Sequence, residues 1–526
     1  MKVTSSTTLA NAGLLLTSSV QAVVFLAPEQ DILLPPSGVA TNPLASLGAN
    51  SPYFAGPNIH NISNQVPANC HVEQVAYNVR HGSRYPDSGA YAQWSTLYAS
   101  IQSANFTSTG SLAFLKSWKP VLTNPTLQIA QESPTGFKEA YDLGYQLRTR
   151  YPDLYPEGQP FICWANLYPR VVQTARNFVR GFLGSTAGNM GMGIVVTVNS
   201  TGSEEALFDS LSPSDLCPEF VDGNGGVQQE TWNSIYLPPI QTRLASLITG
   251  NLNFSTTDIS LMPYLCGFES QITGVLSPWC GVFTDEELAQ YEYSQDLRYY
   301  YGTGPGTDLP SKMMLPYLNT LVGILEQGPG LNGSFANGTS YTLPSILTAF
   351  MNDGQINELG AAAGIWDNTT SLGDGTFIPQ DYKYFASRFV SMRGTVAFER
   401  LSCTIHSPGT STSSSTSVNS TGTSSPRHQP HYTNTPSPPL TPSNSTRASY
   451  IRILLNDAIY PIQTCRSGPG SSCLLSDYAF IIKGKVLAAG DLPTRCNVTA
   501  ASATTKVKGA SFFTDLSSEW VGVVGA

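Results

Sequence analysis

A histidine flanked by two arginines is the part of this sequence with the clearest chemical potential. It stands in the stretch R-H-G-S-R-Y-P, residues 80–86. A neutral imidazole such as that of His81 can attack phosphorus and carry the phosphoryl group as a covalent intermediate. The guanidinium groups of Arg80 and Arg84 can bind phosphate oxygens in pairs and offset their charge. The simpler alternative is a surface histidine between two solvated arginines, but five fixed positions in one short stretch favour the phosphate site.

The position of this stretch in the chain also suits a ligand site. Residues 71–79 carry apolar side chains in the pattern of a buried strand. Gly82 and Pro86 break that strand, and Gly82 allows the backbone to come close to a phosphate. His81 is therefore expected where a strand ends and a loop begins, which is where open α/β sheets bind their ligands.

Another arginine is placed by a helical pattern over residues 166–184. Apolar residues there form one stripe at helical spacing, Pro169 suits the first turn, and Gly184 suits the exit. Arg170 is thus expected at a helix N-terminus, where free N–H groups and the helix dipole attract anions. Alone, an exposed helix arginine is the simpler interpretation. Beside residues 80–86, phosphate binding is favoured.

A carboxylate follows a second short apolar strand. Residues 347–351 are mostly apolar, Asn352-Asp353 comes next, and a helical pattern through Ile356 and Leu359 follows. An alkoxide leaving group must be protonated, so Asp353 at this strand end is a candidate general acid. The alternative is a tight turn in which Asp353 caps the next helix. The residues alone leave these two interpretations open.

Composition points to an exported protein that does not bind nucleic acid. The 526 residues carry a net charge of -9, which argues against general nucleic-acid binding. Lys2, a short apolar run over residues 9–16 and small residues up to Ala22 predict a signal peptide, residues 1–22. No later apolar run is long enough to span a bilayer. We therefore expect a secreted, soluble mature protein without a membrane segment.

The cysteines and glycosylation sequences agree with an oxidising, extracellular compartment. The chain has nine cysteines and no C-x-x-C pair, so we expect disulfides with one cysteine left over and no zinc site. Asn-x-Ser/Thr acceptor sequences recur along the chain. They predict a glycoprotein.

Taken together, these stretches resemble the histidine acid phosphatases, and in particular the secreted fungal acid phosphatases and phytases. The resemblance rests on residues 80–86, the helix of Arg170, the tyrosine-rich residues 291–302 and the Leu-Asn-Asp of residues 455–457. It extends from about residue 70 to 403 and resumes from about 450 to 496.

The resemblance implies a fold and a role for each site residue. The fold is α/β, with a sheet flanked by helices on both faces as in phosphoglycerate mutase, and a smaller, mostly helical second domain over the site. His81 would be the nucleophile that forms a phosphohistidine, and Asp353 would protonate the leaving group. Arg80, Arg84 and Arg170 would bind the phosphate and stabilise its charge during transfer. No metal or other cofactor is expected, because the arginines take the metal's place.

One position departs from the family pattern. The family carries His-Asp where this chain has Asn352-Asp353, and none of the six histidines lies in the middle of the chain to supply the missing one. Asn352 can still donate a hydrogen bond to a phosphate oxygen, but it carries no positive charge. We expect weaker phosphate binding at acid pH rather than loss of the chemistry.

The resemblance also implies a disulfide pattern in which one cysteine stays free. The free residue would be Cys163, and the pairs would be Cys70–Cys403, Cys217–Cys496, Cys266–Cys280 and Cys465–Cys473.

Along the chain we expect the α/β domain to be interrupted twice. The expected parts after the signal peptide are an extended surface arm at 23–50, the α/β domain at 51–184, 341–406 and 449–526, a mostly helical domain at 185–340, and a Ser/Thr/Pro-rich disordered insert at 407–448. The insert has too little apolar content to bury a core. An O-glycosylated loop, a plain disordered insert and non-coding sequence retained in a gene model all remain open for it.

The leading hypothesis is a secreted acid phosphatase that hydrolyses small-molecule phosphomonoesters. Residues 87–101, directly after the arginine-histidine stretch, contain no Lys or Arg to meet several phosphates, which favours a broad acid phosphatase over a dedicated phytase. Two alternatives come from other classes. One is a secreted glycoprotein that binds phosphorylated ligands with little or no turnover, and Asn352 motivates it. The other is an intracellular phosphotransferase of the mutase branch, which conflicts with the signal peptide and the cysteines.

Overall fold

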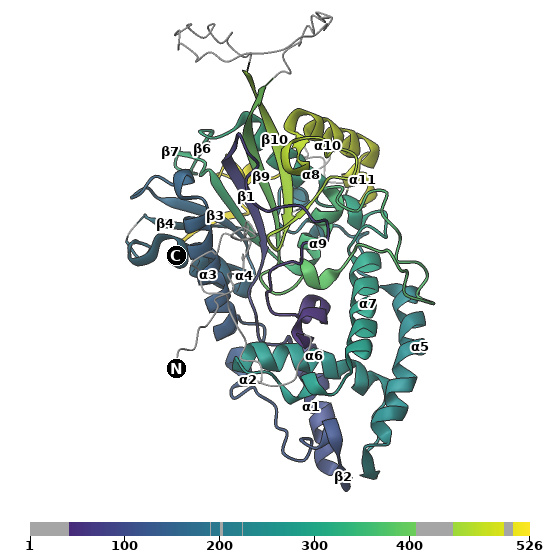
Figure 1. Ribbon diagram of the computed structural model, residues 1–526. Coiled ribbons are helices and arrows are strands. Elements are labelled where there is room, and N and C mark those ends of the chain that lie inside the picture. The colour runs from purple at the N-terminus through teal and green to yellow at the C-terminus, as the bar shows by residue number, and fades with distance from the viewer. Residues whose placement is uncertain (1–41, 190, 200–203, 224, 407–444, 499–508) are drawn as a thin grey trace, which may run out of the picture.

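A sheet of nine strands organises the molecule (Figure 1). The computed structural model describes residues 42–189, 191–199, 204–223, 225–406, 445–498 and 509–526. The strands of the main path, in spatial order, are β11 (Ala458–Tyr460), β10 (Ser445–Leu455), β9 (Thr395–His406), β1 (Cys70–Arg80), β8 (Ile346–Met351), β3 (Phe161–Asn166), β4 (Gly193–Val198) and β13 (Val521–Gly525). The short β12 (Cys473–Leu474) pairs with β10.

The centre of the sheet is parallel and its borders are antiparallel. β1, β8, β3 and β4 run parallel to one another, whereas β9 and β13 pair antiparallel with β1 and β4. Arg80 lies opposite Met351, and Ala165 lies opposite Phe350. The carboxyl ends of β1, β8 and β3 therefore meet at one edge of the sheet, where ligands of open α/β sheets bind.

Helices cover both faces of this sheet, as the sequence led us to expect. On one face, α3 (Pro134–Arg150) and α4 (Pro169–Leu183) pack their apolar stripes onto alternate residues of β1 such as Val75 and Val79. On the other face lie α8 (Leu315–Gln327), α9 (Asp353–Ala362) and α10 (Leu475–Ala489). The prediction of an α/β fold with helices on both faces is confirmed.

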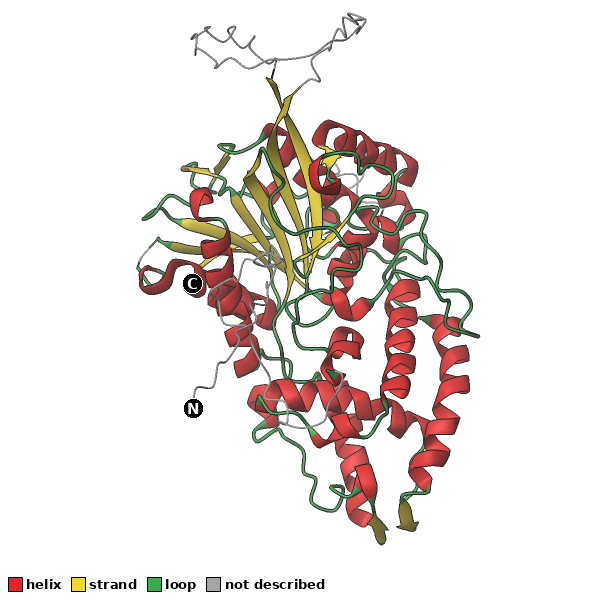
Figure 2. Cartoon of the chain, viewed as in Figure 1, coloured by secondary structure: helices red, strands yellow, loops and turns green. Residues whose placement is uncertain are grey.

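A second, mostly helical part lies beyond the carboxyl edge of the sheet (Figure 2). It is built from α1 (Ser88–Ser103), α5 (Gly226–Ala245), α6 (Thr256–Thr273) and α7 (Asp285–Gly302), with the two-stranded sheet of β2 (Phe106–Ser108) and β5 (Ile248–Gly250). The remaining short elements are α2 (Pro125–Gln128), α11 (Leu492–Arg495), β6 (Asn332–Ser334) and β7 (Ser340–Thr342).

The helical part is less continuous in sequence than we expected. Residues 185–340 were predicted to be mostly helical, but β4 lies within them and belongs to the central sheet. Its sequence, G-I-V-V-T-V, is a short run of β-branched residues that suits a buried strand. α8, at the other end of this range, packs on α10 against the sheet. The expected boundaries at 185 and 340 are therefore wrong.

The expected extended arm at residues 23–50 is also wrong where the structure describes it. Residues 42–50 form two short 3-10 helices, Pro43–Ser46 and Gly48–Asn50. Leu44 and Leu47 are buried in the main core rather than laid over the surface. Burial of these two apolar side chains favours the inward position of the segment. Residues 1–41, with the predicted signal peptide, lie outside the described residues.

The Ser/Thr/Pro-rich insert begins and ends at neighbouring residues of the sheet. β9 and β10 pair continuously up to His406 and Ser445. Residues 445–448, which we assigned to the insert, belong to β10, and residues 407–444 lie outside the described residues. β10 then turns into β11 through Asn456 and Asp457, both with positive φ, so the predicted hairpin is confirmed.

Disulfides join distant parts of the chain. The structure contains Cys70–Cys403, Cys217–Cys496, Cys266–Cys280 and Cys465–Cys473, the four pairs that the family resemblance implies. Cys163 is free and buried in β3. No helix among the described residues is both long and apolar enough to cross a bilayer.

Candidate active site

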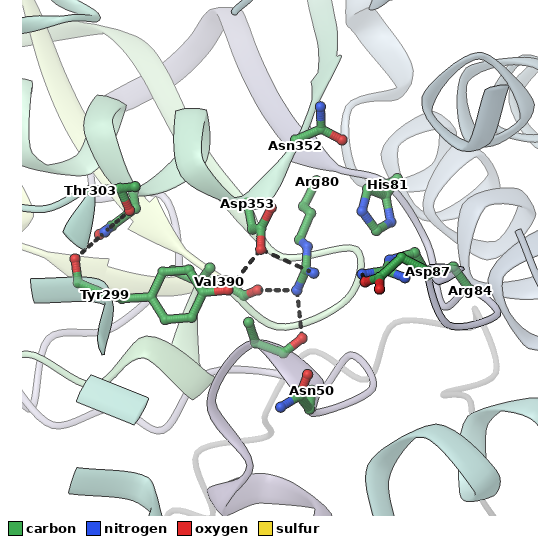
Figure 3. A network of polar contacts seen from close by, with 12 residues as sticks. Asn50, Arg80, His81, Arg84, Asp87, Tyr299, Thr303, Asn352, Asp353 and Val390 are labelled. Carbon is green, nitrogen blue, oxygen red and sulfur yellow. Dashed lines mark hydrogen bonds and ion pairs between the residues drawn. The ribbon is translucent and has the colours of Figure 1, made fainter. Parts of the chain in front are cut away.

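Three strand ends bring the predicted site residues together. His81 follows β1, Asn352 and Asp353 follow β8, and Arg170 is the second residue of α4, just after β3. Parallel pairing of β1 with β8 sets His81 beside Asn352, and the His81 amide donates to the Met351 carbonyl at 3.1 Å. Figure 3 shows His81, Arg80, Arg84, Asn352 and Asp353 around one space.

The imidazole of His81 is buried in a tautomer fixed by its neighbour. Nδ1 lies 2.9 Å from the carbonyl oxygen of Gly82. Because a carbonyl can only accept, Nδ1 carries the hydrogen and Nε2 keeps its lone pair. Burial, followed by the charges of Arg170, Arg80 and Arg84, lowers the pKa of His81 well below its ordinary value. The ring is therefore neutral, with Nε2 available as a nucleophile.

The loop that carries His81 is held from behind by α3. Ser83 donates from its amide to one carboxylate oxygen of Glu139 at 2.6 Å and from its hydroxyl to the other at 2.9 Å. A Cβ on Gly136 would lie 2.1 Å from the Ser83 carbonyl oxygen, so only glycine lets α3 approach this closely. The Gly82 amide donates to the Thr174 hydroxyl of α4 at 3.0 Å. Both helices thus position the backbone next to the His81 imidazole.

Arg80 is a buried arginine aimed into the site. Its Nη1 donates to the carbonyl oxygens of Ala49 and Val390, each at 2.6 Å, and its Nη2 lies 3.5 Å from Oδ2 of Asp353. Only 2% of its side chain is exposed. The buried segment around Ala49 therefore serves the site directly, which explains why it is folded inward.

Arg170, which lies just after β3, contacts Asn352, which lies just after β8. Nη2 of Arg170 donates to Oδ1 of Asn352 at 2.9 Å. Burial and the like charges of Arg84 and Arg80 lower the pKa of Arg170 to about 10. Arg170 nevertheless stays charged at acid and neutral pH.

Arg84 lies at the border between the sheet and the helical part. Its guanidinium carbon lies 5.3 Å from the centre of the Phe268 ring in α6. Its Nη1 donates to the Tyr85 carbonyl, and its Nη2 lies 3.7 Å from the exposed carboxylate of Asp87. The helical part thus supplies one aromatic wall of the site.

The three arginines have spare hydrogen-bonding capacity. In the part of the chain that the structure describes, no group accepts a hydrogen bond from the buried Nε of Arg80, Arg84 or Arg170. Buried polar groups in proteins are normally satisfied. Three guanidinium groups with unused donors around one imidazole form a site suited to a dianion such as a phosphate ester. Among the described residues there is also no cluster of His, Cys, Asp or Glu that could hold a metal ion.

Asp353 begins α9 and faces the arginines. Its Oδ2 accepts a hydrogen bond of 2.7 Å from the hydroxyl of Tyr299, and one third of its side chain is exposed. Burial acts to raise the pKa of Asp353. The charge of Arg80, the hydrogen bond from Tyr299 and the charge of Arg84 act more strongly in the opposite direction, so the pKa lies well below its ordinary value. Without a bound anion, the carboxyl is therefore ionised.

Sequence reasoning missed the residues that hold the site in place. Tyr299, Thr174 and Glu139 contact Asp353, Gly82 and Ser83 respectively. Each lies on a helix, and each was assigned no role. The tyrosine-rich end of α7 was the one available signal, but three successive tyrosines do not reveal which of them reaches the site.

Comparison with known proteins identifies the family. The model of the histidine phosphatase superfamily (branch 2) matches residues 71–456, and the chain belongs to this family. A phytase of Candida albicans is 26% identical over 91% of each chain. The repressible acid phosphatase of Saccharomyces cerevisiae is 25% identical over 88% of each chain. The protein is a phosphomonoester hydrolase of the histidine acid phosphatase type.

Solved structures agree with this assignment. The crystal structure of the phytase from D. castellii has a TM-score of 0.70 and 25% identity, covering 88% of this chain and 90% of that one. The multiple inositol polyphosphate phosphatase of Bifidobacterium longum, with inositol hexasulfate, has a TM-score of 0.55 at 12% identity and covers 84% of this chain. This second likeness shows the shared fold.

Proposed function

We propose that the protein is a secreted acid phosphatase that transfers the phosphoryl group of small phosphomonoesters to His81 and then to water. The observation that carries this proposal is the convergence of three arginines, each with an unused buried Nε donor, on an imidazole whose Nε2 is free. The predicted signal peptide and the four disulfides support secretion.

In the first step, Nε2 of His81 attacks phosphorus, a P–N bond forms and the ester P–O bond breaks. Arg80, Arg84 and Arg170 bind the non-bridging oxygens and offset their charge. The leaving alkoxide takes a proton from Asp353. In the second step, water attacks phosphorus, its proton returns to Asp353, and the P–N bond breaks to release phosphate and neutral His81.

Asp353 must carry a proton for this cycle, although it is ionised in the free site. A bound phosphate dianion offsets the charge of Arg80, which is the main cause of the low pKa of Asp353. Substrate binding therefore raises the pKa of Asp353, and its carboxyl group takes up a proton. Because the protonated form is needed, activity is expected to rise toward acid pH.

The residues at the entrance to the site favour a substrate that carries one phosphate and little other charge. Asp87 lies next to Arg84 at the entrance and is 54% exposed. α1, which follows it, contains no Lys or Arg. A polyanion such as phytate would meet a carboxylate there rather than a cation, so we expect monophosphates to be preferred over phytate.

The test is hydrolysis of 4-nitrophenyl phosphate and phytate by the secreted protein, from about pH 2.5 to 7, a range that spans carboxylate and histidine titration. His81→Ala should abolish turnover while the protein still binds phosphate through the arginines. Acid quenching of the wild type with 32P-labelled substrate should trap labelled protein that His81→Ala does not form. A folded wild type that binds phosphate but hydrolyses neither substrate would favour a binding glycoprotein, the alternative that Asn352 motivates.

A further inference from the structure

Among the described residues of the helical part, Tyr299 is the one whose side chain donates a hydrogen bond to the carboxyl group of Asp353. It lies in the last turn of α7, and its hydroxyl donates to Oδ2 of Asp353 at 2.7 Å. Figure 3 shows Tyr299 and Arg80 both reaching this carboxylate. Burial raises the pKa of Tyr299, so the hydroxyl stays protonated and remains a donor at every pH at which the enzyme works.

We propose that Tyr299 is a positioning residue that makes Oδ1 of Asp353 the oxygen that delivers the proton to the leaving group. This role rests on the proposed function of Asp353 as the general acid. Oδ2 faces two donors, the hydroxyl of Tyr299 and, at 3.5 Å, Nη2 of Arg80. An oxygen that accepts from two donors has no free lone pair for a proton of its own. The proton of the neutral acid is therefore carried by Oδ1.

The position of Tyr299 is itself fixed by buried polar contacts. Nδ2 of Asn357 donates to the Tyr299 carbonyl at 2.7 Å and to Oγ1 of Thr303 at 2.9 Å, and Oδ1 of Asn357 accepts from the Tyr384 hydroxyl at 2.6 Å. Asn357 belongs to α9, the helix that begins at Asp353. These bonds join the end of α7 to α9. They therefore fix the position of Tyr299 relative to the carboxyl group of Asp353.

The ring of Tyr299 is held from its other side by a cation. The guanidinium carbon of Arg298 lies 4.8 Å from the ring centre, and Arg298 makes bonds of 3.0 and 2.7 Å to the two carboxylate oxygens of Asp222. A tyrosine held by its backbone, its ring and its hydroxyl can orient a carboxyl group without touching the substrate. Such positioning affects only the step in which a proton is transferred.

The distinguishing experiment compares two substrates that need the acid to different degrees. Glycerol 2-phosphate releases a strongly basic alkoxide, whereas 4-nitrophenyl phosphate releases a weakly basic phenolate. kcat/KM is the quantity to compare, since it includes phosphoryl transfer to His81 and excludes the later hydrolysis common to both substrates. Loss of the Tyr299 bond also raises the pKa of Asp353, so each protein is compared at its own pH optimum. There, Tyr299→Phe should lower kcat/KM about tenfold or more for glycerol 2-phosphate and less than about threefold for 4-nitrophenyl phosphate.

Two controls separate positioning from general damage. Tyr301→Phe removes a hydroxyl that donates to the Gly373 carbonyl at 2.6 Å, and it should leave both substrates unchanged. The inhibition constant of inorganic phosphate should be the same in Tyr299→Phe as in the wild type, because the arginines are untouched. Phenylalanine fills the same volume, and Asp353 keeps Arg80 and its contact with solvent, so the variant is expected to fold.

A double-mutant cycle decides whether Tyr299 acts through Asp353. In an Asp353→Asn background, Tyr299→Phe should have no further effect on glycerol 2-phosphate. The role is overturned if the loss is equal for both substrates, if it persists in the Asp353→Asn background, or if Tyr299→Phe matches the wild type. An inactive wild type would instead overturn the proposed function, and with it any role for Tyr299, before the variants are compared.

Discussion

Nη2 of Arg170 donates a hydrogen bond of 2.9 Å to Oδ1 of Asn352, and this contact fixes which way the amide points. Oδ1 faces the guanidinium, so Nδ2 is the free donor of Asn352. If Nδ2 binds phosphate, the role expected for Asn352, its hydrogen bond does not depend on the protonation of the side chain, because an amide stays neutral. The position thus lacks the positive charge that the histidine of the family pattern can carry.

Asn352→His should therefore make phosphate binding pH-dependent. A protonated imidazole adds a charge-assisted bond, stronger than a neutral one by about 1 kcal/mol, so the inhibition constant of phosphate should fall about fivefold at low pH. The gain should disappear as the pH rises through the pKa of the new histidine, which Arg170 will lower. Phosphate inhibition measured from about pH 3 to 7 checks this. A constant ratio of wild type to variant across that range would contradict it, and Asn352→Gln serves as the uncharged control.

The close approach of α3 to the loop after His81 gives a second prediction. In Gly136→Ala the new Cβ would lie 2.1 Å from the Ser83 carbonyl oxygen, so either the helix or the loop must move. Overpacking of this kind costs about 1–3 kcal/mol of folding stability, and a displaced loop also moves His81. Urea unfolding and kcat together measure both effects. Gly188→Ala is the matched control, because a Cβ there meets nothing within 4 Å.

Buried carboxyl groups predict that the protein is more stable in acid than at neutral pH. Burial raises the pKa of Glu132 to about 8 and that of Glu269 to about 7, and it also raises the pKa values of Glu139, Glu292, Asp296 and Glu358. Each folded-state pKa lies above the unfolded one, so the folded protein binds more protons. The stability these groups contribute is fully present below about pH 4, near the unfolded pKa values, and is lost as the pH rises through the folded values. The melting temperature should fall from about pH 4.5 to 8.

Glu132→Gln isolates one of these groups. Its amide stays neutral and can still contact the Thr174 hydroxyl, which lies 2.6 Å from Oε1 of Glu132. The stability of the variant relative to the wild type should increase by about 1.4 kcal/mol per pH unit between the two pKa values. Glu286→Gln, which alters an exposed carboxyl, serves as the surface control. A parallel pH dependence for Glu132→Gln and wild type would show that Glu132 ionises normally.

The Cys217–Cys496 bond closes a loop of 279 residues between the segment before α5 and the C-terminal part. Replacing both cysteines by serine should lower the free energy of unfolding by about 2–4 kcal/mol, since a long loop is released in the unfolded state. Thermal unfolding of the double variant measures the loss. Cys163→Ala removes the free thiol instead, and reducing agent should still destabilise that variant as strongly as it does the wild type.

The main lines of the fold could be predicted from the sequence because they depend on local patterns. The strand before His81, the helix of Arg170 and the strand before Asp353 each carry an apolar periodicity with a clear end. The segments that were predicted wrongly stand in surroundings that point elsewhere. β4 has the β-branched residues of a strand, but it lies in a range whose other patterns are helical. Leu44 and Leu47 stand in a Pro- and Ala-rich stretch that indicates nothing about burial.

The site could be predicted in part, for a different reason. The groups that would react with phosphate stand in recognisable stretches, and the structure brings all six to the same strand ends. No sequence pattern marks the residues that hold these reactive groups in place. Tyr299 is 54 residues from Asp353, and Glu139 is 56 residues from Ser83. A supporting contact over such a distance is set by how α3 and α7 pack, which no single stretch of sequence encodes.

The pairing of β9 with β10 up to His406 and Ser445 has a consequence for how this chain can vary. β9 leaves the neighbourhood of His81 at Thr395 and runs 12 residues away from it, about 35–40 Å at the rise of a strand. Both ends of residues 407–444 are anchored at that far point. Residues 407–444 can therefore be replaced without altering the site. The segment could be shortened to a tight turn, exchanged for the loop of a relative or replaced by a fusion partner at a loop-closure cost of only about 2 kcal/mol either way, and the chemistry at the opposite edge of the sheet should proceed unchanged.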